Sequence, residues 1–228
     1  MDFTRVFENA TPLMLRGLKV TIVISLLAIA IGMVIGCVTC LLGRSKHRIF
    51  RMISGVYVWC IRGTPMIVQG FLMFFAFPQV IQKFISPTFT ITPFAAGLLT
   101  LSFNAGAYMS EIFRGGIDAI SKGQIEAARS LGMSKSKTML KVVFPQAFKI
   151  CIPSLVNQFI ITIKDSSILS AIGLADIVNQ TKVYVGGSYD FFPAYITVAG
   201  YYLVIISILM VISKFVEKKF SYDKKSSS

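Results

Sequence analysis

Long apolar runs alternate with short polar segments along the whole chain. Five of the runs are long enough to cross the roughly 30 Å hydrocarbon core of a bilayer, which takes about 20 helical residues. They cover residues 18–42, 57–81, 92–112, 150–174 and 193–212. Water cannot satisfy backbone groups inside lipid, so runs of this length are expected to be helical, and the ten-residue alternation of a membrane β-barrel is missing. We predict an all-α integral membrane protein, one domain over residues 1–228 with five transmembrane helices.

Composition places the chain in the same class. It is 54% hydrophobic and 14% charged, outside the usual soluble range. The net charge of +13 would suggest a nucleic-acid partner for a soluble protein, so its distribution decides the interpretation. Basic residues gather after the first, third and fifth runs, whereas the loops after the second and fourth hold Lys83 and Lys182. The positive-inside rule then predicts an outside N-terminus and a cytoplasmic C-terminus.

Three basic residues before or at the start of the first run, Arg5, Arg16 and Lys19, oppose that orientation. Arg16 and Lys19 with the following apolar run also imitate a secretory signal peptide. The run continues to Leu42, however, which is too long for a signal peptide, and it ends in basic residues. We expect a transmembrane helix there.

Cysteine usage predicts no metal or redox site. Cys37 and Cys40 have the C-x-x-C spacing but lie inside an apolar helix without a neighbouring His or carboxylate, and Cys60 and Cys151 stand alone. We interpret them as small apolar side chains.

A polar block, SKGQIEAARSLGMSKSKTMLKVVFPQ from Ser121 to Gln146, separates the third and fourth runs. Its pattern predicts two short amphipathic helices. Gly132 is a candidate C-cap of the first, Ser134 is placed to cap the second, and Pro145 should break or kink the second helix. The apolar positions at helical spacing are Ile125, Ala128 and Leu131 in the first helix and Leu140, Val143, Phe144 and Ala147 in the second.

Three interpretations of this block compete. It could be a solvated connector whose lysines face anionic headgroups, or a DNA-binding helix-turn-helix, which its attachment to membrane helices at both ends disfavours. It could also dock a cytoplasmic partner that approaches small residues closely. The segment GMSKSKT imitates a phosphate-binding loop, but Leu131 and Ser136 stand where that loop needs glycine. ATP would therefore have to be hydrolysed by another chain.

The block resembles the cytoplasmic signature of bacterial ABC importer permeases: E-A-A, three residues, G, nine residues, I-x-L-P. The matching residues are Glu126, Ala127, Ala128, Gly132 and Pro145, with Val142 and Phe144 in place of Ile and Leu. RGTP (62–65), NAGAYMSEIFRGGI (104–117) and KDSSIL (164–169) look like permeases of polar amino-acid importers of the histidine, glutamine and arginine type. The resemblance covers nearly the whole chain.

This resemblance implies the type I importer permease fold, in the bacterial cytoplasmic membrane. It implies that residues 113–149 form a loop with two coupling helices seated on a separate ABC ATPase. Two permeases, as copies or relatives, would join two ATPases and an extracytoplasmic amino-acid binding protein. The chain itself would be no enzyme and hold no cofactor, since ATP and Mg belong to the ATPase.

Lys164 and Asp165 fall near the middle of the fourth run, where a charge costs a few kcal/mol. Helix neighbours point about 100° apart, so the two do not naturally neutralise each other. A zwitterionic amino acid offers a carboxylate to Lys164 and an ammonium to Asp165; pairing with other helices or the second permease is the alternative. Thr162, Ser166 and Ser167 could supply hydrogen bonds or compensate a distorted backbone.

Further candidates for the substrate pathway are Thr64, Pro65 and Gln69 in the second run and Asn104 in the third. Pro65 should leave the carbonyl one turn back free to face a cavity, although a simple kink explains these residues as well. Glu111 and Arg114 are expected to form a structural ion pair. The alternative function is an ion-gradient-driven transporter or channel, against which the absence of an internal repeat counts. No catalytic constellation is present.

Overall fold

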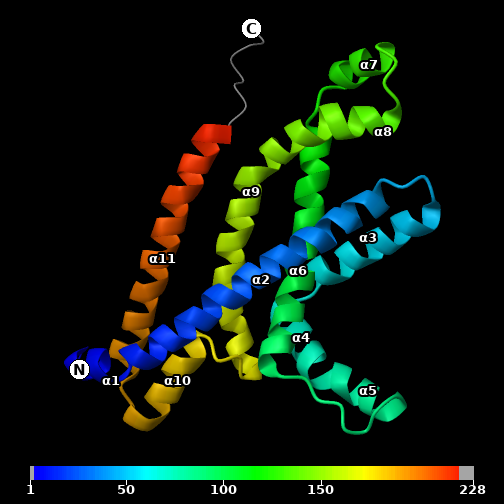
Figure 1. The fold of residues 1–228 in the computed structure, drawn as a ribbon. Coiled ribbons are helices and arrows are strands. Elements are labelled where there is room, and N and C mark those ends of the chain that lie inside the picture. The colour runs from blue at the N-terminus through cyan, green and yellow to red at the C-terminus, as the bar shows by residue number, and fades with distance from the viewer. Residues whose placement is uncertain (1–2, 221–228) are drawn as a thin grey trace.

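The structure is a computed structural model that describes residues 3–220, with side chains described through residue 218; this part of the chain is helical and contains no strand. The short helix α1 (Phe3–Asn9) leads into α2 (Thr11–Gly43), which crosses α6 (Pro93–Asp118) (Figure 1). Gly32 and Gly36 allow this crossing to be close. A Cβ added at Gly32 would lie 3.0 Å from the Cβ of Ala105. Small residues four apart let helix backbones approach in a membrane, where van der Waals packing drives association.

The second apolar run does not form one helix. Its first part belongs to α3 (Arg48–Gly63), and its second part to a continuous helical segment of α4 (Met66–Phe71), the π turn η1 (Leu72–Ala76) and α5 (Phe77–Phe84). Thr64 and Pro65 separate the two parts in extended conformation, with ψ of 144° and 139°. Pro65 lacks the amide hydrogen that would continue the ladder.

Helix α6 lies at the centre of the bundle. Thr92 caps it by accepting a hydrogen bond from the amide of Ala95, and Pro93 occupies its first turn. Its buried residues are mostly small or polar, among them Ser102, Asn104 and Ser110. Among the described residues, four continuous helical stretches are long and apolar enough to cross a membrane: Thr11–Gly43, Met66–Phe84, Lys135–Ile172 and Phe191–Lys218. Helix α6 is 26 residues long but is not among them, because its sequence, which includes Ser102, Asn104 and Glu111, is less apolar.

The polar block forms α7 (Lys122–Ser130) and α8 (Lys135–Thr138), as predicted. Of the two outcomes predicted at Pro145, a break or a kink, the break does not occur, while the helix changes direction between α8 and α9 (Figure 1). Helix α8 continues through the π turn η2 (Met139–Val143) into α9 (Phe144–Asp165), and Pro145 sits in the first turn of α9. A π turn widens the helix by one residue, which removes the clash that proline makes inside an α-helix.

The last part of the chain completes the bundle. The 3-10 helix η3 (Ser166–Ile172) extends α9 and ends at Gly173, whose φ is +85°. After α10 (Ile177–Ser188), α11 (Phe191–Phe220) runs back along α9. In Figure 1, α7, α8 and the last turns of α11 lie at one end of the molecule, and α1, α10 and η3 lie toward the other.

Candidate substrate pathway and coupling block

Gln69 closes the break between α3 and α4. Its amide nitrogen contacts the carbonyl oxygen of Ile61 at 2.7 Å and both the carbonyl and the hydroxyl oxygen of Thr64 at 3.0 Å. The Ile61 carbonyl is the one that Pro65 releases, so the expectation that it faces a cavity unpaired is wrong. Thr64 donates its own hydroxyl to the carbonyl of Cys60 at 2.8 Å. The break is therefore a hydrogen-bonded kink.

Asn104 joins the same network from α6. Its amide nitrogen donates to the side-chain oxygen of Gln69 at 3.1 Å, and the residue is buried. The structure thus brings together Thr64 from the break, Gln69 from α4 and Asn104 from α6. Since the amide nitrogen of Gln69 is bound within the protein, this geometry favours the kink interpretation of the second run.

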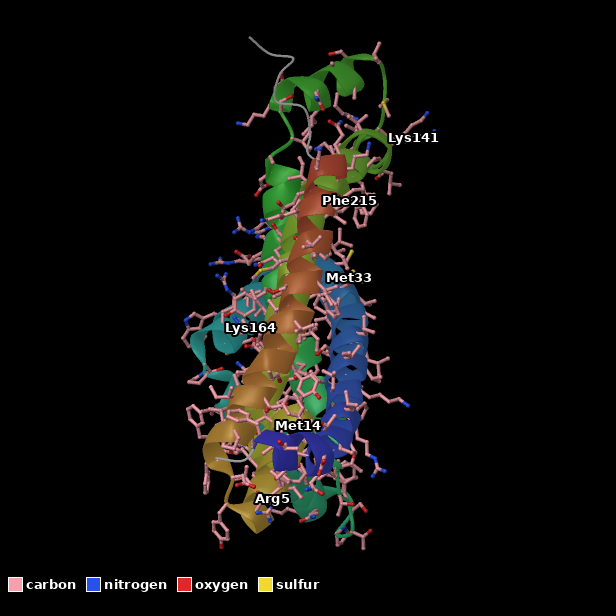
Figure 2. All side chains as sticks on the ribbon, turned by 90° about the vertical axis from the view of Figure 1, so that its left-hand side faces the viewer. Arg5, Met14, Met33, Lys141, Lys164 and Phe215 are labelled. Carbon is pink, nitrogen blue, oxygen red and sulfur yellow. The ribbon has the colours of Figure 1, made fainter. Side chains whose placement is uncertain are left out.

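Lys164 and Asp165 lie in the last turn of α9, where the α-helix becomes the 3-10 helix η3. Lys164 is exposed and Asp165 is half-buried. Within residues 3–218, neither side chain makes an ion pair or a hydrogen bond, although the two interact electrostatically. Figure 2 shows Lys164 near mid-height, on the opposite side of the molecule from Met33. The expectation that the two charges do not neutralise each other in one ion pair is confirmed.

The hydroxyl groups around this pair are used by their own helix. Thr162 donates to the carbonyl of Gln158 at 2.9 Å, and Ser166 donates to that of Ile163 at 2.8 Å. Ser167 donates to the carbonyl of Lys164 at 2.6 Å. Such bonds compete with the helical ladder and accompany a change of helix type. These hydroxyls were expected either to bind substrate or to compensate a distorted backbone. In the structure they bind backbone carbonyls where the helix changes type, which is the second role.

An ion-pair network surrounds the α7 end of α6. Arg114 binds Glu111 through two contacts, of 3.1 Å and 2.6 Å, which confirms the expected ion pair. The hydrogen bonds that Arg114 donates to Glu111 raise the pKa of Arg114 above its usual range. Arg44 approaches Asp118 at 2.6 Å, Arg114 approaches Asp118 at 3.7 Å, and Arg62 approaches Glu111 at 3.5 Å. Sequence spacing revealed the contact within one helix and missed those made by Arg44 and Arg62 from distant segments.

A tight turn at Gly132 joins α7 to α8. The φ of Gly132 is +82°, and the amide of Met133 donates to the carbonyl of Ala128 at 3.2 Å, which closes the turn. Ser134 caps α8 by accepting from the amide of Lys137 at 3.3 Å. Both predicted caps are confirmed.

The small residues of the turn do not all face outward. Glu126 and Ala127 are exposed and a Cβ at Gly132 would meet open space, whereas Ala128 is buried. Leu131 is 84% exposed, although its spacing had assigned it to the packed face of the helix. The turn residues after Ser130 rotate Leu131 out of the α7 register, which helical spacing does not anticipate.

One buried carboxylate escaped the sequence analysis. Asp176 caps α10 by accepting from the amide of Asn179 at 2.9 Å, and its second oxygen has no partner among the described residues. Burial raises its pKa to about 6. The only sequence signal was a capping residue before an apolar stretch, which does not reveal burial.

Residues 28–222 match the family described as binding-protein-dependent transport system inner membrane component. The arginine transport system permease protein ArtQ of Bacillus subtilis (strain 168) is 38% identical over 219 residues, covering 96% of this chain and 97% of ArtQ. The glutamine transport system permease protein GlnP of Escherichia coli (strain K12) is 35% identical over 210 residues, covering 92% and 94%.

Two solved structures share the fold. A crystal structure of an amino acid ABC transporter with histidines superposes with a TM-score of 0.89 at 35% identity, covering 96% of this chain and 99% of that one. The MetNI methionine ABC transporter in an inward-facing conformation superposes with a TM-score of 0.76 at 19% identity, covering 91% and 96%. At that identity the second likeness shows the fold alone.

Proposed function

The chain belongs to the family of binding-protein-dependent transport system inner membrane components, and from this premise we propose that it is the membrane-spanning permease of an ATP-driven importer of polar amino acids. The relatives that support this substrate class are permeases for arginine and glutamine. The single observation that carries the proposal is the α7–Gly132–α8 turn, which is exposed at one end of an apolar helical bundle. An exposed Leu131 beside an open glycine suits a partner that approaches the backbone closely.

The partner proposed for this turn is a cytoplasmic ABC ATPase dimer, which binds ATP and Mg. A second permease, identical or related, and an extracytoplasmic amino-acid binding protein complete the complex. This chain would supply no catalytic residue. The protein would be located in the bacterial cytoplasmic membrane, as one multi-pass domain over residues 1–228.

The proposed topology has five spans, with α6 as the third. The N-terminus lies outside and the C-terminus in the cytoplasm. Two observations support this orientation: the basic clusters follow the first, third and fifth runs, and the end of α11 lies at the same end of the molecule as α7 and α8. Helix α6 can span the membrane because other helices cover its polar residues, among them Ser102, Asn104 and Ser110.

The mechanism follows from the continuity of α8 with α9. One helical segment, Lys135–Ile172, joins the ATPase-binding turn to Lys164 and Asp165. At 1.5 Å per residue, Lys164 lies about 44 Å along this segment from Lys135. Closure of the ATPase dimer would move α8, and α9 would carry the movement to the charged pair. The kink at Gln69, between α3 and α4, is a position where the helices around the pathway can bend.

We expect bulk at Gly132 to uncouple transport from ATP hydrolysis, because a large side chain would fill the space that the ATPase occupies. Gly132→Trp should reduce ATP-driven uptake in proteoliposomes at least tenfold. Gly132→Ala controls for the strain of the left-handed φ, and Gly123→Trp adds the same bulk at another open position of the block. Equal uptake by Gly132→Trp and Gly132→Ala would show that no partner docks at this turn.

A further inference from the structure

A cavity of about 540 Å³ lies between α3, α6, α9 and α11, apart from Lys164 and Asp165. Its lining includes Arg62, Glu111, Asn157, Gln158 and Glu217. Gln158 precedes Lys164 on α9 by about 9 Å along the axis, in the direction of α8. The cavity is open, since Arg62, Asn157 and Glu217 are exposed, and its volume falls within the range of small-molecule sites.

The cavity contains polar side chains that the protein does not satisfy. Gln158 is only 5% exposed, and its side-chain amide has no hydrogen-bond partner within residues 3–218. The side-chain amide of Asn157 is equally without a partner in this part of the chain. Asn157 is exposed, and neither amide is among the buried side-chain atoms without a partner, so both amides reach solvent in the cavity. A polar molecule bound there could replace water as their hydrogen-bond partner.

The charges around the cavity are unbalanced. In the network described above, Arg44, Arg62 and Arg114 share only two carboxylates, those of Glu111 and Asp118. Each carboxylate already has another arginine at 2.6 Å, while Arg62 stands 3.5 Å from Glu111 with its guanidinium 5.3 Å from the ring centroid of Tyr108. The surplus positive charge therefore rests on Arg62.

A negative group comes from another element. The Glu217 carboxylate accepts a hydrogen bond from the hydroxyl of Ser213 at 3.2 Å and makes no ion pair with any residue up to 218. Helices α3 and α11, which carry Arg62 and Glu217, lie on opposite sides of α9 in Figure 1. The cavity thus offers a cation, an anion and two free amides, which complement a carboxylate and an ammonium on one small molecule.

We propose that this cavity is a second amino-acid site, in which Arg62 binds the α-carboxylate, Glu217 the α-ammonium and Gln158 a polar side chain. The inference rests on the proposed function and adds a binding site between Lys164 and the α7 end of the molecule. An amino acid leaving Lys164 and Asp165 would meet this site before it reaches the cytoplasm.

The test is binding to the permease–ATPase complex in lipid nanodiscs, without nucleotide or binding protein. Equilibrium dialysis with radiolabelled L-glutamine and L-arginine should reveal two classes of sites. Arg62→Gln and Gln158→Leu should each weaken one class at least tenfold, and Lys164→Met should weaken the other. Arg48→Gln on α3 and Gln180→Leu on α10, which lie outside the cavity lining, should bind as wild type does.

Wild-type isotherms for both Arg62→Gln and Gln158→Leu, or a single class of sites that Lys164→Met abolishes, would overturn the second site. Size-exclusion chromatography checks assembly; if Arg62→Gln does not assemble, Arg62→Lys and Gln158→Leu carry the test. ATP-driven uptake by the wild type, measured on the same preparation, separates the two proposals. Uptake with one class of sites refutes the cavity alone, whereas loss of ATP dependence refutes the importer function.

Discussion

At the residue scale, Lys164 and Asp165 are adjacent charges in an apolar helix and neither has an ion-pair partner within residues 3–218. A charge at membrane depth costs a few kcal/mol, so it persists where something recovers that cost. Around Glu111 the protein pairs its charges closely. Lys164 lacks such a pair, which supports the proposal that a ligand supplies the negative group opposite Lys164.

Removing the Lys164 charge should weaken substrate use without unfolding the protein. A hydrogen bond to a charged group contributes about 1.5–3 kcal/mol, so Lys164→Met should raise the KM for uptake by roughly tenfold to a hundredfold. Lys149→Met changes an exposed lysine of the same helix and serves as the control. If Lys164→Met lowered the Tm and left the KM unchanged, Lys164 would be part of the scaffold.

Sequence reasoning reached residues whose partners are close along the chain. Glu111 and Arg114 were predictable because residues three apart share a helix face. Arg62 and Gln158 were not recognised as cavity residues, because the cavity forms only when α3, α6, α9 and α11 pack together. The sequence predicted that Gln69 lies close to the break at Pro65. It did not predict the hydrogen bond from Gln69 to the Ile61 carbonyl, because that bond depends on the geometry of the kink.

At the element scale, close packing of glycines sets how α6 meets its neighbours. Gly115 and Gly116 are adjacent in α6, but only Gly116 faces α9. A Cβ added at Gly116 would overlap the sulfur of Cys151 and lie 3.0 Å from the carbonyl oxygen of Ala147. A Cβ at Gly115 would meet nothing within 4 Å.

Alanine should therefore have opposite effects at these two positions. Gly116→Ala should destabilise the protein by about 1–3 kcal/mol, because the added methyl group overpacks the contact between α6 and α9. Gly115→Ala should leave stability unchanged or raise it by up to about 1 kcal/mol, since alanine is the better helix former. Thermal unfolding of the two purified variants in detergent measures the difference; equal Tm values would contradict the packing of α6 against α9.

Helix positions were predictable to the extent that apolar runs determine them. Runs 18–42 and 193–212 fall inside α2 and α11, which are uninterrupted helices longer than the runs themselves. The run 57–81 concealed a break, because Thr64 and Pro65 are only two residues in an otherwise apolar segment. At Pro145, where a break or a kink was predicted, the π turn η2 keeps the helix continuous, so no break occurs. A π turn depends on local widening that single-residue propensities do not encode.

At the scale of the whole molecule, the two regions proposed to be functional lie at separate levels of one helical bundle. The α7–α8 turn lies at one end, and Lys164 lies near mid-height (Figure 2). The continuous segment Lys135–Ile172 connects them, so movement of the turn reaches the charged pair without crossing a loop. A permease driven by an external ATPase needs a connection between the docking turn and the substrate pathway, and this segment provides one without a loop.

The most direct measurement of the central claim is ATP hydrolysis by the complete complex in proteoliposomes, recorded together with uptake of a labelled polar amino acid. Binding protein loaded with the amino acid should stimulate hydrolysis several-fold over unloaded protein, and uptake should stop when ATP is replaced by a non-hydrolysable analogue. Uptake by this chain alone, without the ATPase and driven by a sodium or proton gradient, would contradict the account.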